Sequence, residues 1–186
     1  MLRLFVAIEL PKTLKEELGK FTEQSSKEVS GAKWVEPKNL HISLKFLGNF
    51  PEENLPKLLT KIEEATWRIK PFNLRLSKAG AFPTERKARV FWMGTEGSES
   101  ELEKLHKSID KNMEKLGFER ENRKFHSHIT LARFRTPQNI ESLISKFDFK
   151  ASGDEVFEVK EIVLFKSELT PRGSIYTILK NFPLKG

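Results

Sequence analysis

The sequence predicts an α+β fold made of two similar lobes with a cleft between them. Segments in which apolar and polar residues alternate, as in half-buried strands, are interspersed with segments in which apolar residues recur every three or four positions, as on one face of a helix. The order of these segments in the first half of the 186-residue chain is repeated in the second half. The two halves also carry near-copies of one tetrapeptide, HISL at 41–44 and HITL at 128–131.

The first half is predicted to contain three long strands and two helices. The first helix begins near Pro11, and its buried face carries Leu14, Leu18 and Phe21 at helical spacing. Pro51 suits the first position of the second helix, where the backbone N–H has no intrahelical partner. In order, we expect a strand over 2–10, a helix over about 11–28, a short extended segment at 34–35, a strand over 40–47, a helix from 51 and a strand over 72–79.

The second half repeats this order. Thr136 and Pro137 resemble a helix N-cap followed by proline at the first helical position. The helix that they open would bury Ile140, Leu143 and Phe147. In order, we expect a strand over 89–94, a helix over 99–116, a strand over 127–134, a helix from 137, and strand-like segments over 156–169 and 176–181 separated by a turn at 170–173.

The two halves match at a nearly constant offset of 86 or 87 residues, and His41 and His128 are 87 residues apart. A fixed offset indicates internal duplication. We therefore expect residues 1–186 to form a single bilobal domain, with lobe 1 at about 1–80 and lobe 2 at about 88–186. Each lobe would be a β-α-β-α-β unit whose sheet is backed by helices. The two histidine strands would face each other across the central cleft.

The composition excludes several classes of function. The chain has no cysteine, which excludes disulfides, thiolate metal sites and a cysteine nucleophile. No segment approaches the roughly 18 apolar residues of a membrane span, and the N-terminus begins directly with a strand pattern rather than a secretory signal. We therefore expect a cytoplasmic protein that does not associate with membranes. The net charge of +7 favours polyanionic partners, although a solvated surplus of lysine gives the same value.

The two tetrapeptides pair an imidazole with a hydroxyl on one strand face. Because side chains alternate along a strand, His41 shares a face with Ser43, and His128 shares a face with Thr130. Histidine, with an ordinary pKa of about 6.5, both accepts and donates protons near neutrality. Replacing one oxygen on phosphorus needs a base for the nucleophile and an acid for the leaving oxygen. The two hydroxyls would donate hydrogen bonds to the phosphoryl oxygens.

Two basic residues close to these motifs are candidates for binding phosphate. Lys45 lies on the predicted face of the first histidine. Strict alternation puts Arg133 on the buried face of its strand, so it reaches the cleft only through a bend or bulge at Ala132. We expect the neighbouring aromatic residues Trp34 and Phe46 to lie in the core.

Each motif alone has a simpler structural explanation. A histidine two residues before a hydroxyl arises often by chance, whereas two copies at matching positions of a duplicated chain favour catalysis. His126 and His128 alternate on one strand face at a spacing that can bind zinc, but the sequence offers no evident third ligand. We therefore expect no metal and no cofactor. His106 lies beside the apolar stripe of a predicted helix, which favours a structural role.

Four segments together resemble a known family over almost the whole chain. They are RLFVAI at 3–8, WV at 34–35 with NLHISLKFLG at 39–48, RVFWMG at 89–94, and FHSHITLAR at 125–133. These segments are similar to those of the two-histidine phosphoesterases, specifically the bacterial and archaeal RNA 2′,3′-cyclic phosphodiesterases, also called 2′-5′ RNA ligases. The resemblance implies two antiparallel sheets around a basic cleft.

The resemblance also implies an activity and roles for individual residues. The activity is metal-independent hydrolysis of a terminal 2′,3′-cyclic phosphate on RNA, which leaves a 2′-phosphate. His41 matches the general acid that protonates the departing 3′ oxygen, and His128 matches the base that activates water. Ser43, Thr130 and Arg133 match positions that contact the phosphate. The same pair of histidines would support weak reverse ligation of a cyclic end to a 5′-hydroxyl.

Two other functions are compatible with these residues. One is a phosphodiesterase that acts on small cyclic nucleotides or ADP-ribose cyclic phosphates. The other is a non-catalytic module that binds RNA ends, although both histidines are present, which argues against it. In each case we expect a monomer, because the duplication already supplies both halves of a site. The expected partner is RNA with a 2′,3′-cyclic phosphate end.

Overall fold

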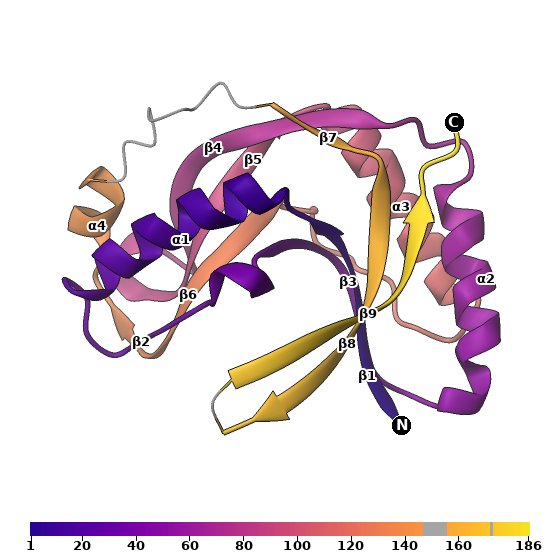
Figure 1. The fold of residues 1–186 in the computed structure, drawn as a ribbon, viewed down its shortest axis with the longest axis horizontal. Coiled ribbons are helices and arrows are strands. Elements are labelled where there is room, and N and C mark those ends of the chain that lie inside the picture. Colours follow the sequence, from indigo (N-terminus) through magenta and orange to yellow (C-terminus); the bar gives the residue numbers. More distant parts are fainter. Residues whose placement is uncertain (147–155, 172) are drawn as a thin grey trace.

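The nine strands of the described residues form one antiparallel sheet, in the order β7-β4-β5-β6-β3-β1-β8-β9, with β2 paired to β6. The structure is a computed structural model that describes residues 1–146, 156–171 and 173–186 (Figure 1). The strands are β1 (Leu2–Glu9), β2 (Ala32–Trp34), β3 (His41–Phe50), β4 (Phe72–Phe82), β5 (Ala88–Gly97), β6 (His128–Gln138), β7 (Phe157–Val159), β8 (Glu161–Thr170) and β9 (Gly173–Pro183). The helices are α1 (Lys12–Ser26), α2 (Leu55–Thr66), α3 (Glu99–Glu114) and α4 (Glu141–Lys146), with short 3-10 turns η1 (Pro37–Asn39), η2 (Glu52–Asn54) and η3 (Glu85–Lys87).

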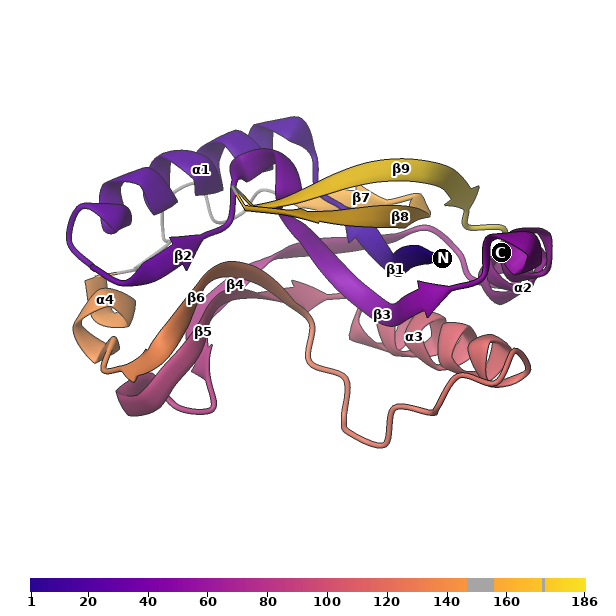
Figure 2. The same ribbon diagram turned by 90° about the horizontal axis from the view of Figure 1, so that it is seen from below.

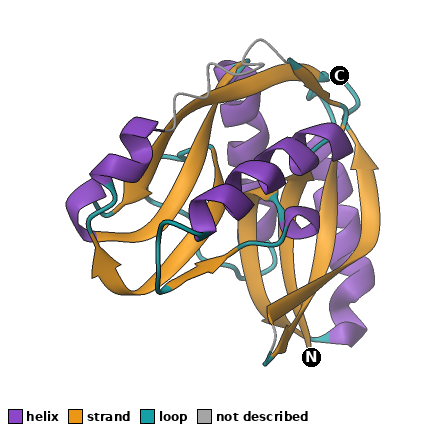
Figure 3. Ribbon diagram, turned by 60° about the vertical axis from the view of Figure 1, so that its left-hand side comes forward, coloured by secondary structure: helices purple, strands orange, loops and turns teal. Residues whose placement is uncertain are grey.

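The sheet consists of two halves that meet at one point. Strands β7, β4, β5 and β6 form one half, and β3, β1, β8 and β9 form the other. In the described part of the chain, the register joins β3 to β6 through one residue pair, Ile42 with Ile129. Both isoleucines are fully buried. Because the junction is so short, the halves diverge around it and the sheet is strongly curled (Figures 2 and 3).

Each half of the sheet takes strands from both halves of the sequence. β4 pairs with β5 and with β7, whereas β8 pairs with β1 and with β9. The sequence lobes that we predicted at about 1–80 and 88–186 therefore exchange their outer strands. The α+β class, with antiparallel strands and flanking helices, is confirmed. A single bilobal domain with internal duplication remains our proposal for the domain organisation.

The helices cover the sheet with the apolar stripes that their sequences carry. On α2, Leu58 and Ile62 are fully buried, and on α3 so are Leu105 and Ile109. Figure 1 shows α2 and α3 side by side near one end of the molecule, while α1 lies beside β2 and η1. These stripes join most of the buried strand residues in one core, and Phe5, Ala7, Val163 and Phe165 form a second, smaller cluster. No helix in the described ranges has both the length and the hydropathy that a membrane span requires.

Most predicted elements are confirmed within a few residues, but the strand-like segment predicted over 156–169 is divided into β7 and β8, which pair with β4 and β1 respectively. Two predicted helix starts are also wrong. Pro51 precedes η2, and α2 begins only at Leu55. Thr136 and Pro137 continue β6, because pairing of β6 with β5 extends to Gln138. The next residue, Asn139, accepts the Glu141 N–H at 3.0 Å through its side chain, just before α4 begins.

Two residues of the predicted elements lie outside the part of the chain that the structure describes. They are Phe147, which the sequence predicts in the apolar stripe of the helix at α4, and Arg172, which it predicts in the last turn.

Because the half-sheets join at the Ile42–Ile129 pair, we expect truncation of either isoleucine to destabilise the protein strongly. Ile129→Ala removes a fully buried side chain and leaves a cavity, so we expect it to lower the free energy of unfolding by about 2–5 kcal/mol. Ile178→Ala, at a position that is 45% exposed on β9, is the matched control and should cost far less. Urea unfolding measures both. Equal losses in the two variants would contradict a special role for the junction.

Candidate active site

The junction between the half-sheets places both motifs on one face of the sheet. Ile42 pairs with Ile129, and the residues on either side of each isoleucine point to the opposite face. In an antiparallel pair, His41 then lies across from Thr130 and Ser43 across from His128. The two imidazoles occupy diagonal positions, which in a regular ladder are about 7–8 Å apart. Both histidines are partly buried, so neither is sealed in the core.

His41 is held at both ring nitrogens. Its Nδ1 lies 2.7 Å from the carbonyl oxygen of Asn39, and its Nε2 lies 3.0 Å from the hydroxyl of Ser43. Because a carbonyl only accepts, Nδ1 carries the hydrogen, and Nε2 of the neutral ring accepts from Ser43. The ring packs against Phe5 and Tyr176, with centroid distances of 4.9 and 5.5 Å. These contacts leave Nε2 as the atom that can exchange a proton.

His128 has the same contact at Nδ1 in the second motif. Its Nδ1 lies 2.7 Å from the carbonyl oxygen of His126, two residues before it, as Asn39 is two residues before His41. Its ring lies 5.2 Å from that of Phe82, centroid to centroid. The backbone carbonyl therefore fixes the same tautomer in both histidines. Sequence analysis missed these two acceptors, although the equal spacing in the duplicated halves was a signal for them.

Burial favours the neutral form of both imidazoles. It lowers the pKa of His41 to about 4, against the opposing effect of the Asn39 carbonyl, and the charges of Lys15, Arg133 and His128 lower it further. Burial also lowers the pKa of His128, opposed by the His126 carbonyl and assisted by Arg133. A bound phosphate anion would act in the opposite direction, because negative charge favours the imidazolium.

One extra residue in each motif strand changes which side chains reach this face. On β3, Ser43 pairs with Ala7 but Lys45 pairs with Val6, so Leu44 is the inserted residue of a β-bulge. On β6, Thr130 and Ala132 pair with the adjacent β5 residues Trp92 and Phe91, so Leu131 is the inserted residue. The two bulges are 87 residues apart, like the histidines, and each follows the hydroxyl residue directly.

The second bulge turns Arg133 toward the histidines. Thr130 pairs with Trp92 and Arg133 pairs with Val90, and these two partners share a face of β5. Arg133 is exposed, and its charge lowers the pKa of both His41 and His128, so it lies within electrostatic reach of each. The predicted requirement for a bulge is met, one residue earlier than Ala132.

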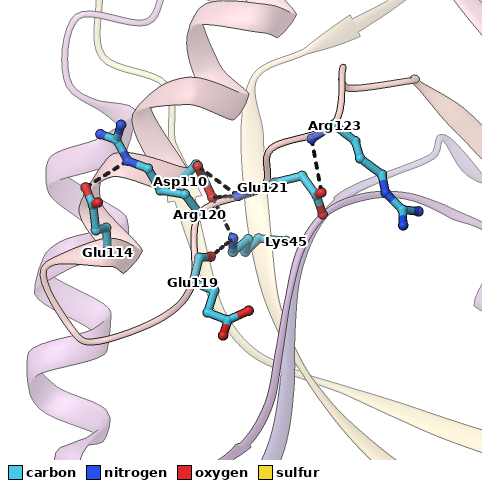
Figure 4. A network of polar contacts seen from close by, with 7 residues as sticks. All are labelled: Lys45, Asp110, Glu114, Glu119, Arg120, Glu121 and Arg123. Atoms are coloured by element: carbon cyan, nitrogen blue, oxygen red, sulfur yellow. Dashed lines mark hydrogen bonds and ion pairs between the residues drawn. The ribbon is translucent and has the colours of Figure 1, made fainter.

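The first bulge turns Lys45 away, and our expectation that it shares the face of His41 is wrong. Lys45 Nζ lies 2.5 Å from Asp110 Oδ1 and 2.7 Å from the carbonyl oxygen of Glu119 (Figure 4). The exposed fractions of the Lys45 and Asp110 side chains are only 11% and 12%. Asp110 also accepts the Glu121 N–H at 3.2 Å. Lys45 therefore connects β3 to α3 and to the segment that follows α3. It is not one of the proposed phosphate contacts.

The same bulge exposes Phe46, which we expected in the core. Phe46 pairs with Phe5 and is 64% exposed, with the two ring centroids 5.8 Å apart. It thus lies on the face of His41, at the position that duplication relates to Arg133. Trp34 is partly buried against the core, 6.1 Å from the ring of Phe91, as expected.

The remaining histidines have packing contacts. His106 is buried and stacks on Phe125 with a centroid distance of 4.2 Å. The His126 ring lies 4.7 Å from that of Trp92. Within residues 1–146, 156–171 and 173–186, no three histidine or carboxylate side chains gather as a candidate metal site.

Comparison with known proteins assigns the family. A family model described as the 2′-5′ RNA ligase superfamily matches residues 10–171. A curated protein of Methanocaldococcus jannaschii, named RNA 2′,3′-cyclic phosphodiesterase, is 37% identical over 97% of this chain and 100% of its own length. A protein of the same name from Archaeoglobus fulgidus is 36% identical over 97% of this chain and 99% of its own length.

Solved structures agree with this assignment. TT0787 of Thermus thermophilus has a TM-score of 0.79 at 29% identity, covering 99% of this chain and 98% of that chain. LigT of E. coli, crystallised with 3′-AMP, has a TM-score of 0.75 at 27% identity, covering 100% of this chain and 99% of that chain. The resemblance seen in the motifs is confirmed, and the chain belongs to the 2′-5′ RNA ligase superfamily.

Proposed function

We propose that this protein hydrolyses 2′,3′-cyclic phosphate ends of RNA to 2′-phosphates, using His41 and His128 as acid and base and no metal. The observation that carries the proposal is the common face at the junction, where a backbone carbonyl holds Nδ1 of each imidazole and leaves Nε2 available, with a hydroxyl residue two positions further along each strand. The names of the M. jannaschii and A. fulgidus relatives support the substrate and the reaction. We further propose that the protein acts as a cytoplasmic monomer.

In the proposed reaction, proton transfers at the two histidines accompany one displacement at phosphorus. His128 Nε2 accepts a proton from water, and the water oxygen forms a bond to phosphorus. The bond between phosphorus and the 3′ oxygen breaks, and His41 Nε2 gives its proton to that oxygen. The products are a 2′-phosphate and a 3′-hydroxyl. Each carbonyl behind Nδ1 keeps its ring oriented during the transfer.

Ser43, Thr130 and Arg133 are the proposed phosphate contacts. In the empty site the Ser43 hydroxyl donates to His41 Nε2. When that nitrogen gains a proton it can no longer accept, and the hydroxyl becomes available to a phosphoryl oxygen. Thr130 has the matching position beside His128. The Arg133 guanidinium, turned to this face by its bulge, would pair with the charge that develops on the non-bridging oxygens.

Phe46 supports a nucleic-acid substrate rather than a bare phosphate. Its exposed ring and that of Phe5 lie on the face of His41. Nucleobases stack on aromatic side chains with about 1–3 kcal/mol each, with little dependence on sequence. We propose that a base next to the cyclic phosphate stacks on Phe46.

The same groups would support the reverse ligation that we also propose as a weak activity. With a 5′-hydroxyl in the place of water, His128 takes the hydroxyl proton and His41 again protonates the 3′ oxygen. The product is a 2′-5′ linkage, and the reaction requires no nucleotide cofactor because the cyclic phosphate is the reacting group. Water is present at far higher concentration than RNA ends, so hydrolysis should dominate.

The test of this function is an oligoribonucleotide that ends in a 2′,3′-cyclic phosphate, incubated in EDTA. We expect turnover to a 2′-phosphate, and we expect His41→Ala and His128→Ala each to lower kcat by at least about 10²-fold, because each removes a positioned proton-transfer group. Lys107→Ala, at an exposed position on α3, is the control. Circular dichroism checks that the variants are folded.

Other outcomes of this assay distinguish the alternatives. Turnover of mononucleotide cyclic phosphates in preference to the oligonucleotide would favour the small-molecule phosphodiesterase. Binding of the oligonucleotide without turnover would favour a non-catalytic module. Activity that disappears in EDTA and returns with a divalent cation would overturn the metal-independent mechanism.

The lowered histidine pKa values predict the pH dependence of the reaction. In the free enzyme both groups titrate below the ordinary value of 6.5, so raising the pH above that value removes the proton that the acid must donate. We expect kcat/KM to reach its maximum below pH 6.5 and to fall as the pH rises. The profile of kcat should lie at higher pH, because bound phosphate favours the imidazolium. A kcat/KM maximum well above neutrality would contradict this electrostatic description.

A further inference from the structure

A partly buried lysine on α1 contacts the turn that precedes His41. Lys15 Nζ donates to Glu9 Oε1 at 2.9 Å and to the carbonyl oxygen of Lys38 at 3.1 Å. Its side chain is 13% exposed. On the same helix the ion pair of Lys12 with Glu16 is longer, at 3.8 Å, and the Lys12 side chain is 91% exposed. The Lys15 contacts are therefore part of the packed structure rather than a solvated surface pair.

The turn that Lys15 holds is η1, which determines the position of the acceptor for His41. Lys38 contributes the carbonyl that accepts from Lys15, and the next residue, Asn39, contributes the carbonyl that accepts from His41 Nδ1. α1 also touches this turn at Gly19, where a Cβ would lie 2.6 Å from Pro37 Cγ. Close packing and a hydrogen bond thus fix η1 against α1.

A third contact comes from the opposite side. The side-chain amide of Asn39 donates to the carbonyl oxygen of Ser174 on β9 at 2.9 Å. η1 is therefore held between α1 and β9. The direction of the Asn39 carbonyl, and with it the orientation of the His41 ring, depends on both contacts.

The same lysine contributes to the charge around His41. Glu9 on β1 is the cross-strand partner of His41, and Glu9 holds Lys15. Arg133 and His128 approach from β6, and the Tyr176 ring of β9 lies 5.5 Å from the imidazole. The positive charges of Lys15, Arg133 and His128 all disfavour the imidazolium. Glu9, the residue that pairs with His41 in the sheet, carries a negative charge on β1.

We infer that Lys15, together with Glu9, is a positioning residue for His41: helix α1 fixes the carbonyl that orients the imidazole and sets the charge balance beside it. The kinetic part of this inference rests on the proposed function. The titration of His41 does not, because it can be followed in the free protein.

The test substitutes each member of the Lys15–Glu9 ion pair in turn. The two substitutions should shift the pKa of His41 in opposite directions. Lys15→Met removes one of the positive charges that lower the pKa of His41, so we expect that pKa to rise above about 4 but to stay below 6.5, because burial, the largest cause of the low value, is unchanged. Glu9→Gln removes a negative charge, so we expect the pKa to fall. Lys15→Arg keeps the charge and should leave the titration close to that of the unmodified protein. Lys12→Met on the same helix is the matched control.

Nuclear magnetic resonance of the His41 imidazole follows the titration, and the pH profile of kcat/KM on the cyclic-phosphate oligonucleotide follows its consequence. We expect Lys15→Met to lower kcat/KM by about 10- to 100-fold, since displacement of a reacting group by about 1 Å costs roughly 10²-fold, and we expect Lys15→Arg to restore part of it. Thermal unfolding checks each variant.

Two results would overturn the inference. One is a shift of the His41 pKa in the same direction in Lys15→Met and in Glu9→Gln, which would indicate a general loosening of the fold. The other is a shift in Lys15→Met no larger than that in Lys12→Met. If the protein does not turn over the oligonucleotide, the proposed function fails, and the nuclear magnetic resonance titration alone still decides the role of Lys15. If Lys15→Met does not fold, Glu9→Gln and Lys15→Arg provide the comparison.

Discussion

The pairing of Ile42 with Ile129 is the constraint on which the site depends. It is a short contact between two half-sheets that otherwise diverge, and it brings together residues that are 87 positions apart in the chain. Because strand side chains alternate, burying these two isoleucines places their four polar neighbours on the opposite face. The core and the candidate active site are therefore two sides of the same backbone pair. Its packing determines the separation of the imidazoles.

The matched bulges at Leu44 and Leu131 determine which side chains the two motif strands present beside the histidines. Each bulge reverses the faces of the residues that follow it. On β6 this turns a cation, Arg133, toward the histidines, and on β3 it turns an aromatic ring, Phe46, to the same side. Strand β6 thus contributes a cation to this face, and β3 contributes a flat apolar surface. Lys45, sent to the far face, instead joins β3 to α3 through Asp110.

Burial helps to orient each histidine ring, but it opposes the protonation that proton transfer requires. It orients each ring against a carbonyl, and it also makes the charged form costly, so both pKa values fall. In the proposed mechanism one ring must be charged when phosphate is bound. The anion itself then supplies the favourable interaction that the empty site lacks. Positive neighbours such as Lys15 and Arg133 would keep the free site neutral while attracting the substrate.

The sequence alone determined most of the elements and the two histidine–hydroxyl motifs, because alternation and helical spacing are local properties that each segment carries. The family followed from the same segments. Only the tertiary structure decided which face Lys45, Phe46 and Arg133 occupy and where β6 ends, because a bulge and a register depend on the partner strand. Contacts between distant segments also determine the exchange of β4 and β8 between the half-sheets and the hydrogen bond from α1 to the turn before His41. Local pattern fixes what a segment forms, whereas cross-strand pairing fixes where its side chains point.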